Sequence, residues 1–169
     1  MAPLKVKLWA LLLISLAAGC TASSEPPKMG TLGSTHIHAD FKVYLNSTLV
    51  DFSQDKYQVR NQFIHVESHN GDVIHFHATN EQFGFFFSTV NMTLTKDCFT
   101  FDDGKKFCSN DEKQLRMYIN GKPNSQFGAY IPRDCDKILI SYGTEAGIPT
   151  QLESITSRAC TQATKGKQM

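Results

Sequence analysis

The stretch that decides the fold class is residues 36–45, HIHADFKVYL, in which apolar and polar side chains alternate. Alternation with a period of two is typical of a β-strand that buries one face. The apolar side chains of this strand are those of Ile37, Ala39, Phe41, Val43 and Leu45. His36 and His38 therefore share the opposite face. The pattern predicts a half-buried strand whose polar face carries two histidines.

Further short strands are expected along the chain, from alternating or β-branched runs over 49–52, 62–67, 72–78, 115–119 and 137–142. We place a hairpin turn at His69-Asn70-Gly71, because Asn-Gly favours two-residue turns. The apolar cluster at 83–90 is compatible with a short helix or a buried strand, and its lack of alternation favours the helix. A C-terminal helix is expected to begin near Pro149, with a tail to residue 169. The predicted fold class is α+β, mostly β.

All six histidines lie between positions 36 and 77. The alternation in each predicted strand indicates on which face its histidines lie. His69 falls in the turn and is left out. Two histidines in a His-x-His strand project from one face with their Cα atoms about 6.5 Å apart, and a neighbouring strand can add a third ligand. Imidazole suits copper and zinc. The polar faces of three strands predict a copper or zinc site built from His36, His38, His65, His75, His77 and Glu67.

Two other interpretations of the histidines stay open. They are compatible with ordinary solvated residues on the exposed face of a sheet. They are also compatible with a proton sensor, because clustered imidazoles repel one another when charged below about pH 6.5.

Five cysteines are present in the 169 residues, and the first has a separate explanation. The run Leu16-Ala17-Ala18-Gly19-Cys20 follows a basic start and a short apolar segment, and it resembles the lipobox of prokaryotic lipoproteins. The resemblance implies a signal peptide at 1–19, a lipid on Cys20 and a flexible tether over 20–34. We therefore expect an extracytoplasmic, membrane-anchored protein. The alternative is an ordinary cleaved signal peptide.

The four remaining cysteines predict two disulfides, since an even number in an exported chain favours pairing. A three-residue loop over 102–104, with Gly104 in the left-handed conformation, pairs Cys98 directly with Cys108. By elimination Cys135 pairs with Cys160. A redox role for Cys98 and Cys108 is the alternative, although their spacing is not Cys-x-x-Cys. The glycosylation sequons at Asn46 and Asn91 fit an exported chain. Whether these asparagines are glycosylated stays open.

Charge and motif content narrow the function classes. The formal net charge is +1, and about −1 once Lys5 and Lys7 of the signal peptide are removed, so no nucleic-acid partner is expected. The sequence has no Gly-x-Ser-x-Gly elbow and no phosphate-binding glycine loop. An enzyme would need a metal-bound hydroxide with Glu67 or Asp40 as base. The sequence therefore favours a non-enzymatic function.

Residues 115–121, LRMYING, with Tyr130 and the segment 134–142, DCDKILISY, resemble transcobalamin-C-terminal-like β-grasp domains. Those domains carry the pattern Y-V-N-G, then Y, then D-G-D-x-I and Y, and Cys135 stands in place of the second glycine. The resemblance spans roughly residues 83–143. It implies a β-grasp-like domain over 35–143, in a family of ligand-binding or adhesive surface modules.

Residues 35–157 also resemble small exported proteins of ammonia-oxidising archaea, some of which carry a protein-disulfide isomerase label. The matching runs are His36-x-His38-Ala39, Asp51-Phe52-Ser53, His75-x-His77-Ala78, Leu94-Thr95-x-x-Cys98 and ILISYG at 138–143. This resemblance implies an archaeal, copper-dependent cell, which favours copper over zinc.

The predicted function is therefore a surface-anchored lipoprotein that captures or buffers copper or zinc, with delivery to a protein partner as an option. Two alternatives remain. One is an extracytoplasmic thiol-disulfide oxidoreductase or isomerase that uses Cys98 and Cys108. The other is a structural or adhesive surface module.

Overall fold

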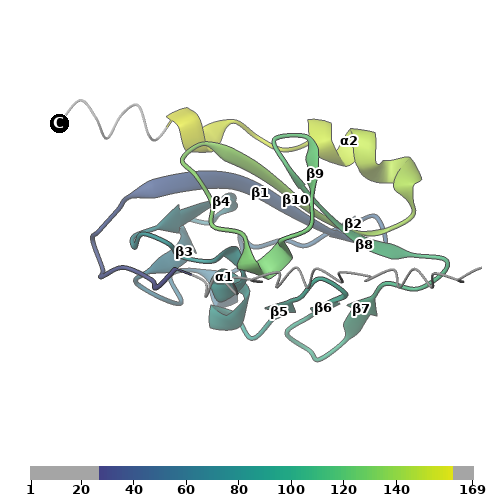
Figure 1. Cartoon of the computed structure of the whole chain (residues 1–169), viewed down its shortest axis with the longest axis horizontal. Helices are drawn as coiled ribbons and strands as arrows, with labels where there is room; N and C mark the ends of the chain where they lie inside the picture. The colour runs from purple at the N-terminus through teal and green to yellow at the C-terminus, as the bar shows by residue number, and fades with distance from the viewer. Residues whose placement is uncertain (1–26, 162–169) are drawn as a thin grey trace, which may run out of the picture.

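A computed structural model describes residues 27–161 of the chain (Figure 1). The expected signal peptide, the lipid on Cys20 and residues 20–26 of the expected tether lie outside the described residues. In the rest of that segment, the amides of Gly30 and Gly33 donate hydrogen bonds to the carbonyls of Thr79 and His77. The described part is mostly β, with 36% strand and 19% helix, which confirms the α+β class. Within residues 27–161 no helix has the length and apolar character needed to cross a bilayer.

The elements follow in the order β1 (Ile37–Leu45), β2 (Thr48–Leu49), β3 (Ile64–Glu67), β4 (Asn70–Phe76), α1 (Phe83–Thr89), β5 (Thr93–Leu94), β6 (Cys98–Thr100), β7 (Lys106–Cys108), β8 (Gln114–Ile119), β9 (Lys122–Asn124), β10 (Asp136–Gly143) and α2 (Ile148–Glu153). Short 3-10 helices lie at Asp55–Tyr57, Phe127–Ala129 and Glu145–Gly147.

The main sheet has the strand order β3-β4-β1-β10-β8-β9, with β2 paired to β1. The central strand β1 runs parallel to β10, with Ala39 opposite Asp136, and antiparallel to β4. The sheet is therefore mixed, with one parallel pair at its centre and antiparallel neighbours. A second, three-stranded sheet consists of β5, β6 and β7 (Figure 1).

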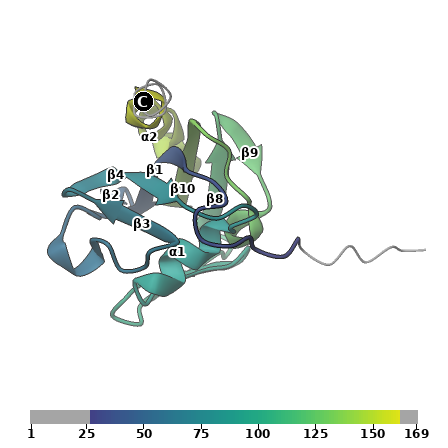
Figure 2. The same ribbon diagram turned by 90° about the vertical axis from the view of Figure 1, so that its left-hand side faces the viewer.

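The two faces of the main sheet are covered differently. One face packs the apolar side of β1 against the phenylalanines of α1, of which Phe83, Phe86 and Phe87 are fully buried. On the other face, α2 and the segment after it cover β10, where Leu139 packs with Ile148 and Ile155. Figure 2 shows α1 and α2 on opposite sides of the sheet. The part of the second face over β1, β3 and β4 carries the histidines.

The hairpin between β3 and β4 turns two residues earlier than predicted. Ser68 and His69 both have a φ of +54°, and Asn70 already pairs with Glu67 inside the ladder. Gly71 has a different role, because a Cβ atom there would lie 2.4 Å from the backbone nitrogen of Ser53. The Asn-Gly pair therefore marks a close backbone approach and not the turn.

One other predicted strand is shorter than expected, whereas the predicted start of the C-terminal helix is confirmed. The returning strand expected over 49–52 is only Thr48–Leu49, because a tight turn at 46–47 lets just two pairs form before the chain leaves the sheet. The C-terminal helix begins at Ile148, with Pro149 in its first turn, and ends at Glu153. Residues 158–161 form a separate helical turn.

Both predicted disulfides are present. Cys98 faces Cys108 across the β6–β7 hairpin, and Gly104 has a φ of +84° in the three-residue loop. Cys135 is bonded to Cys160, 25 residues later. Cys135 has a φ of +69°, a conformation that glycine adopts most easily.

Candidate metal centre

Three adjacent strands bring the predicted ligands together on one face of the sheet. In the ladder His38 of β1 lies opposite His75 of β4, and His75 lies opposite His65 of β3. His36 and His77 stand just outside the ends of β1 and β4, where the amide of His77 still donates to the carbonyl of Phe63. The strand phases inferred from the sequence therefore place all five imidazoles side by side.

The five imidazoles form one continuous group, which we call the histidine cluster (His36, His38, His65, His75 and His77). The ring centroids of His38 and His75 are 4.5 Å apart, and those of His36 and His77 are 4.7 Å apart. The ring of His65 lies 5.0 Å from that of His77 and 5.5 Å from that of His75. No ring is isolated, so any ion near the centre meets several nitrogen donors.

Two overlapping sets within the cluster could hold a metal ion, and His75 belongs to both. One set is His36, His38 and His75, and the other is His65, His75 and His77; in each, the ligand nitrogens lie within 4.8 Å of one another. Bonds of about 2.0–2.1 Å to one tetrahedral ion would place nitrogens roughly 3.4 Å apart. Movements of the rings by about 1 Å would therefore bring the nitrogens of either set within bonding distance of one ion.

Glu67 faces the second set. The Nδ1 atom of His65 lies 2.9 Å from the carbonyl oxygen of Asn61, so this nitrogen carries a proton and donates. In the neutral ring, Nε2 of His65 then presents a lone pair to Glu67 Oε2 at 3.4 Å, and Glu67 Oε1 lies 3.7 Å from Nε2 of His75. A lone pair facing a carboxylate calls for a cation between them, either a proton or a metal ion.

Burial disfavours the charged form of two central imidazoles, those of His38 and His75. His38, His65 and His75 are each less than a tenth exposed. Burial, reinforced by the neighbouring histidines, lowers the pKa of His75 from its ordinary value to about 3. The pKa values of His38 and His77 are also lowered, chiefly by burial. Neutral imidazole is the form that binds metals.

Two buried ring nitrogens have no hydrogen-bond partner among the described residues, Nδ1 of His38 and Nε2 of His77. Buried polar atoms are normally paired, so each unpaired one needs an explanation. One of these nitrogens belongs to each ligand set. An ion coordinated by either nitrogen would satisfy that nitrogen.

The C-terminal segment secures β1 beside the histidine cluster. The buried carboxylate of Asp40 accepts hydrogen bonds from the hydroxyl of Thr156 and from the amides of Arg158 and Ala159, the latter two at 2.9 and 3.1 Å. These bonds occupy both oxygens of Asp40. The carboxylate therefore acts as a structural acceptor, and not as the base that an enzymatic mechanism would need.

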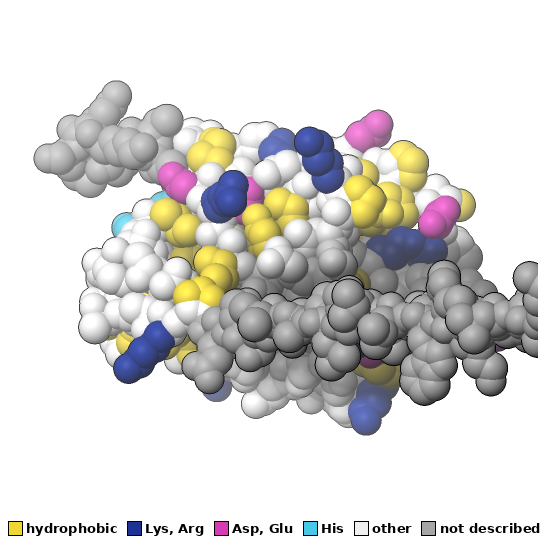
Figure 3. Space-filling model, viewed as in Figure 1, with side chains coloured by type: hydrophobic (Ala, Val, Ile, Leu, Met, Phe, Trp, Pro, Cys, Tyr) yellow, Lys and Arg dark blue, Asp and Glu magenta, His cyan; other side chains and the backbone are white. Residues whose placement is uncertain are grey.

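His69 lies apart from the cluster, as predicted: its side chain is 72% exposed and its Nδ1 is 3.4 Å from Asp55. Figure 3 shows histidine at the left margin of the face drawn, beside acidic and basic side chains of mixed sign. Residues that the sequence did not single out also matter here. The carboxylate of Asp134 accepts from the amide of His38 at 3.1 Å, a contact across 96 positions that has no local signal.

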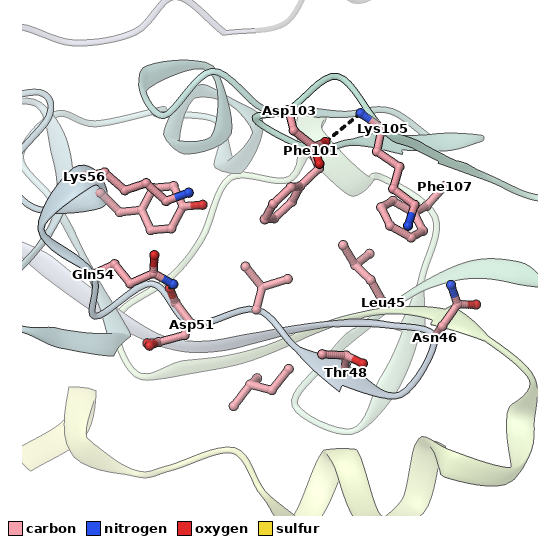
Figure 4. A pocket seen from close by; sticks show the side chains of 13 residues that line it. Leu45, Asn46, Thr48, Asp51, Gln54, Lys56, Phe101, Asp103, Lys105 and Phe107 are labelled. Carbon is pink, nitrogen blue, oxygen red and sulfur yellow. Dashed lines mark hydrogen bonds between the residues drawn. The ribbon is translucent and has the colours of Figure 1, made fainter.

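A groove of about 500 Å³ lies between the β1–β2 turn and the β6–β7 hairpin. No histidine lines it. Figure 4 shows Phe101 and Phe107 pointing into it from the hairpin, towards Leu45. Its lysines have partners within the chain. Lys56 pairs with Asp102 at 2.7 Å, and Nζ of Lys105 lies 5.2 Å from the ring centroid of Phe107. We assign no ligand to this groove.

Comparison with known proteins returns no match: no family model, no curated protein and no solved structure corresponds to this chain. The function must therefore be inferred from the site itself.

Proposed function

We propose that this protein binds one transition-metal ion, Cu²⁺ or Zn²⁺, in the histidine cluster and serves to capture or buffer it at a cell surface. The convergence of five imidazoles from three strands, two of them with buried unpaired nitrogens, supports the proposal. The surface location rests on the expected lipid at Cys20. Copper is favoured over zinc by the resemblance to exported archaeal proteins.

The favoured ligand set is His65, His75 and His77 with Glu67. Its donors include the Nε2 lone pair of His65, which already faces the carboxylate. Three histidines and one carboxylate complete a four-coordinate sphere without an open position for water. A closed sphere suits storage and transfer better than hydrolysis.

Titration of the metal-free protein with CuSO₄ or ZnCl₂, in competition with a chelating dye, tests the proposal. About one equivalent should bind. His75→Ala removes the ligand common to both sets and should weaken binding by more than about 100-fold, since even second-shell changes cost 10–100-fold. His69→Ala is the matched control, because its imidazole lies outside the cluster, and it should leave affinity unchanged. Equal affinity of the His75→Ala variant and the original protein would exclude the site.

Single variants distinguish the two ligand sets. His77→Ala removes a ligand of the favoured set alone, and His38→Ala removes one of the other set alone. We expect the larger loss from His77→Ala, together with a loss of more than about 10-fold from Glu67→Gln, because a charged ligand becomes a neutral amide. If His38→Ala has the larger effect, the ion occupies the set nearer β1. Counting coordinated nitrogens in the Cu²⁺ form by electron paramagnetic resonance gives an independent measure.

A further inference from the structure

The first described residues run alongside one end of the histidine cluster, and we call residues 28–34 the N-terminal strap. The amide of Gly33 donates a hydrogen bond to the carbonyl oxygen of His77, with an N···O distance of 2.7 Å. The amide of Gly30 donates to the carbonyl oxygen of Thr79 at 2.8 Å. The composition of this segment predicts a flexible tether, whereas these bonds fix it to the chain that directly follows β4.

His77 is the ligand of the favoured set that most depends on such support. It stands one residue beyond the end of β4, whereas His65 and His75 lie inside paired strands. The amide of His77 donates to the carbonyl of Phe63 at 2.8 Å, and its own carbonyl accepts from Gly33. The strap therefore supplies the hydrogen bond on one side of the His77 backbone, and Phe63 supplies that on the other.

The backbone conformation of Gly33 aims its amide at His77. Gly33 has a φ of +82° and lies in a turn that the amide of Ser34 closes by donating to the carbonyl of Thr31 at 3.0 Å. A positive φ at the third position of such a turn favours glycine. Proline has a φ near −65° and no N–H group, so proline at this position would remove both the turn conformation and the bond to His77.

The strap is held by hydrogen bonds and not by apolar burial. All of its residues except Gly30 are exposed. Its two large apolar side chains, those of Met29 and Leu32, are 41% and 45% exposed. Segments with few buried apolar contacts open locally, at a free energy well below that of global unfolding. The strap can therefore leave the sheet while the rest of the fold stays intact.

We propose that the N-terminal strap is a positioning element of the metal site, in which Gly33 acts through His77 to set the affinity of the histidine cluster for its ion. This inference rests on the metal binding proposed above. With the strap in place, the His77 ring lies 4.7 Å from that of His36 and 5.0 Å from that of His65, measured between centroids. With the strap detached, the backbone of His77 loses the bond from Gly33, and one ligand is no longer held at the ion. The strap continues into the expected tether, so displacement of the tether would weaken metal binding.

Competition with a chelating dye, in full-chain variants, tests the proposal. Gly33→Pro should bind Cu²⁺ about 10–100-fold more weakly than the original protein, which is the range for loss of outer-shell support of a metal ligand. Gly104→Pro is the matched control and should keep the original affinity. Gly104 lies in the hairpin of the other sheet, has a φ of +84°, and donates its amide to the carbonyl of Phe101 at 2.9 Å, and a Cβ atom at either glycine would meet open space. Ser34→Ala removes only the bond from the amide of Thr79 and should cause a smaller loss in the same direction.

A double-mutant cycle separates positioning from general destabilisation. In the His77→Ala background, Gly33→Pro should cause no further loss of affinity, because the ligand through which Gly33 acts is absent. Electron paramagnetic resonance of the Cu²⁺ form of Gly33→Pro should count one coordinated nitrogen fewer than in the original protein. Additive losses from the two substitutions, or equal affinities of Gly33→Pro and Gly104→Pro, would overturn the proposal.

Failure of this proposal and failure of the metal proposal are distinguishable. If the original protein binds neither Cu²⁺ nor Zn²⁺, the metal proposal itself fails. If the original protein and the Gly33→Pro variant bind Cu²⁺ with the same affinity, the metal proposal stands and the role of the strap is excluded. Circular dichroism and the melting temperature of each variant check folding.

Discussion

The backbone amide of Cys135 donates a hydrogen bond to the carbonyl oxygen of His38, with an N···O distance of 2.8 Å. The disulfide between Cys135 and Cys160 therefore joins a loop that directly holds a strand of the histidine cluster. The neighbouring Asp134 accepts from the amide of His38. The position of one candidate ligand thus depends on a covalent bond to the C-terminal segment.

Removal of this bond in a Cys135→Ser/Cys160→Ser variant should affect stability and metal binding together. The free energy of unfolding should fall by about 3 kcal/mol, as loop-closure entropy suggests. Metal affinity should also fall, because the loop that holds β1 loses its tie and β1 pairs His38 with His75, the ligand common to both sets. Urea denaturation and metal titration measure the two effects.

The Cys98→Ser/Cys108→Ser variant is the matched control. It breaks the hairpin disulfide between β6 and β7, which belong to the other sheet and carry no histidine, and should cost a similar ~3 kcal/mol. Its metal affinity should stay unchanged. Equal losses of metal affinity in the two variants would show that the effect comes from general destabilisation.

Acid should destabilise the metal-free protein through its buried imidazoles. His75 takes up a proton near pH 3 in the folded state but near its ordinary pKa of 6.5 in the unfolded state. The unfolded state therefore binds more protons between these values, and the free energy of unfolding falls as pH decreases through this range. The slope is at most about 1.4 kcal/mol per pH unit for each such histidine. Urea denaturation from pH 7 to pH 4 should show a smaller slope for His75→Gln and an unchanged slope for the exposed His69→Gln.

Glu81 should act in the opposite direction. Its pKa is about 7 when folded against an ordinary value of 4.5, so the folded state holds more protons between these pH values. Stability is therefore lost as pH rises from 4.5, and the loss is complete above pH 7. Glu81→Gln should raise the free energy of unfolding at pH 8 by about 1–3 kcal/mol and change it little at pH 4. A destabilised variant at pH 8 would contradict the burial of a charged carboxyl.

Substitution of Gly71 should be far more damaging than substitution of Gly104. A Cβ atom on Gly71 would lie 2.4 Å from the nitrogen of Ser53 and 2.6 Å from the carbonyl carbon of Phe52. Gly71→Ala should therefore lower the free energy of unfolding by about 3 kcal/mol, through overpacking against backbone. Gly104 has a positive φ but open space around it, so Gly104→Ala should cost only about 1 kcal/mol. Thermal denaturation compares the two, and similar losses would mean that backbone conformation alone matters.

The arrangement of the histidines could be predicted because each lies next to buried side chains that fix the phase of its strand. Ile64 and Val66 place His65 on the polar face, as Ile74 and Phe76 do for His75. The hairpin register at Cys98 was predictable for a similar reason, since glycine is needed at one position of the loop. In both cases the decisive contacts lie within a few residues along the chain.

Features that depend on distant contacts were not predictable in this way. Gly71 carries the usual signal of a turn, yet its reason lies in the backbone of Phe52 and Ser53, which approaches it from an earlier loop. Glu81 stands in a polar stretch with no mark of burial, and its environment includes Ile131 and Pro132 from a segment 50 positions later. Side-chain patterns report which face is buried, but not which segment covers it.

The parallel pairing of β1 with β10 also bears on how the protein folds. Every candidate metal ligand is synthesised before residue 80, but the second neighbour of β1 follows about 100 residues after that strand. A growing chain therefore presents an unpaired β1 edge until β10 emerges, and pairing between distant segments is slow to form. His38 of the histidine cluster lies on this same strand, so the side of β1 that pairs with β4 can form early while the edge that faces β10 stays open.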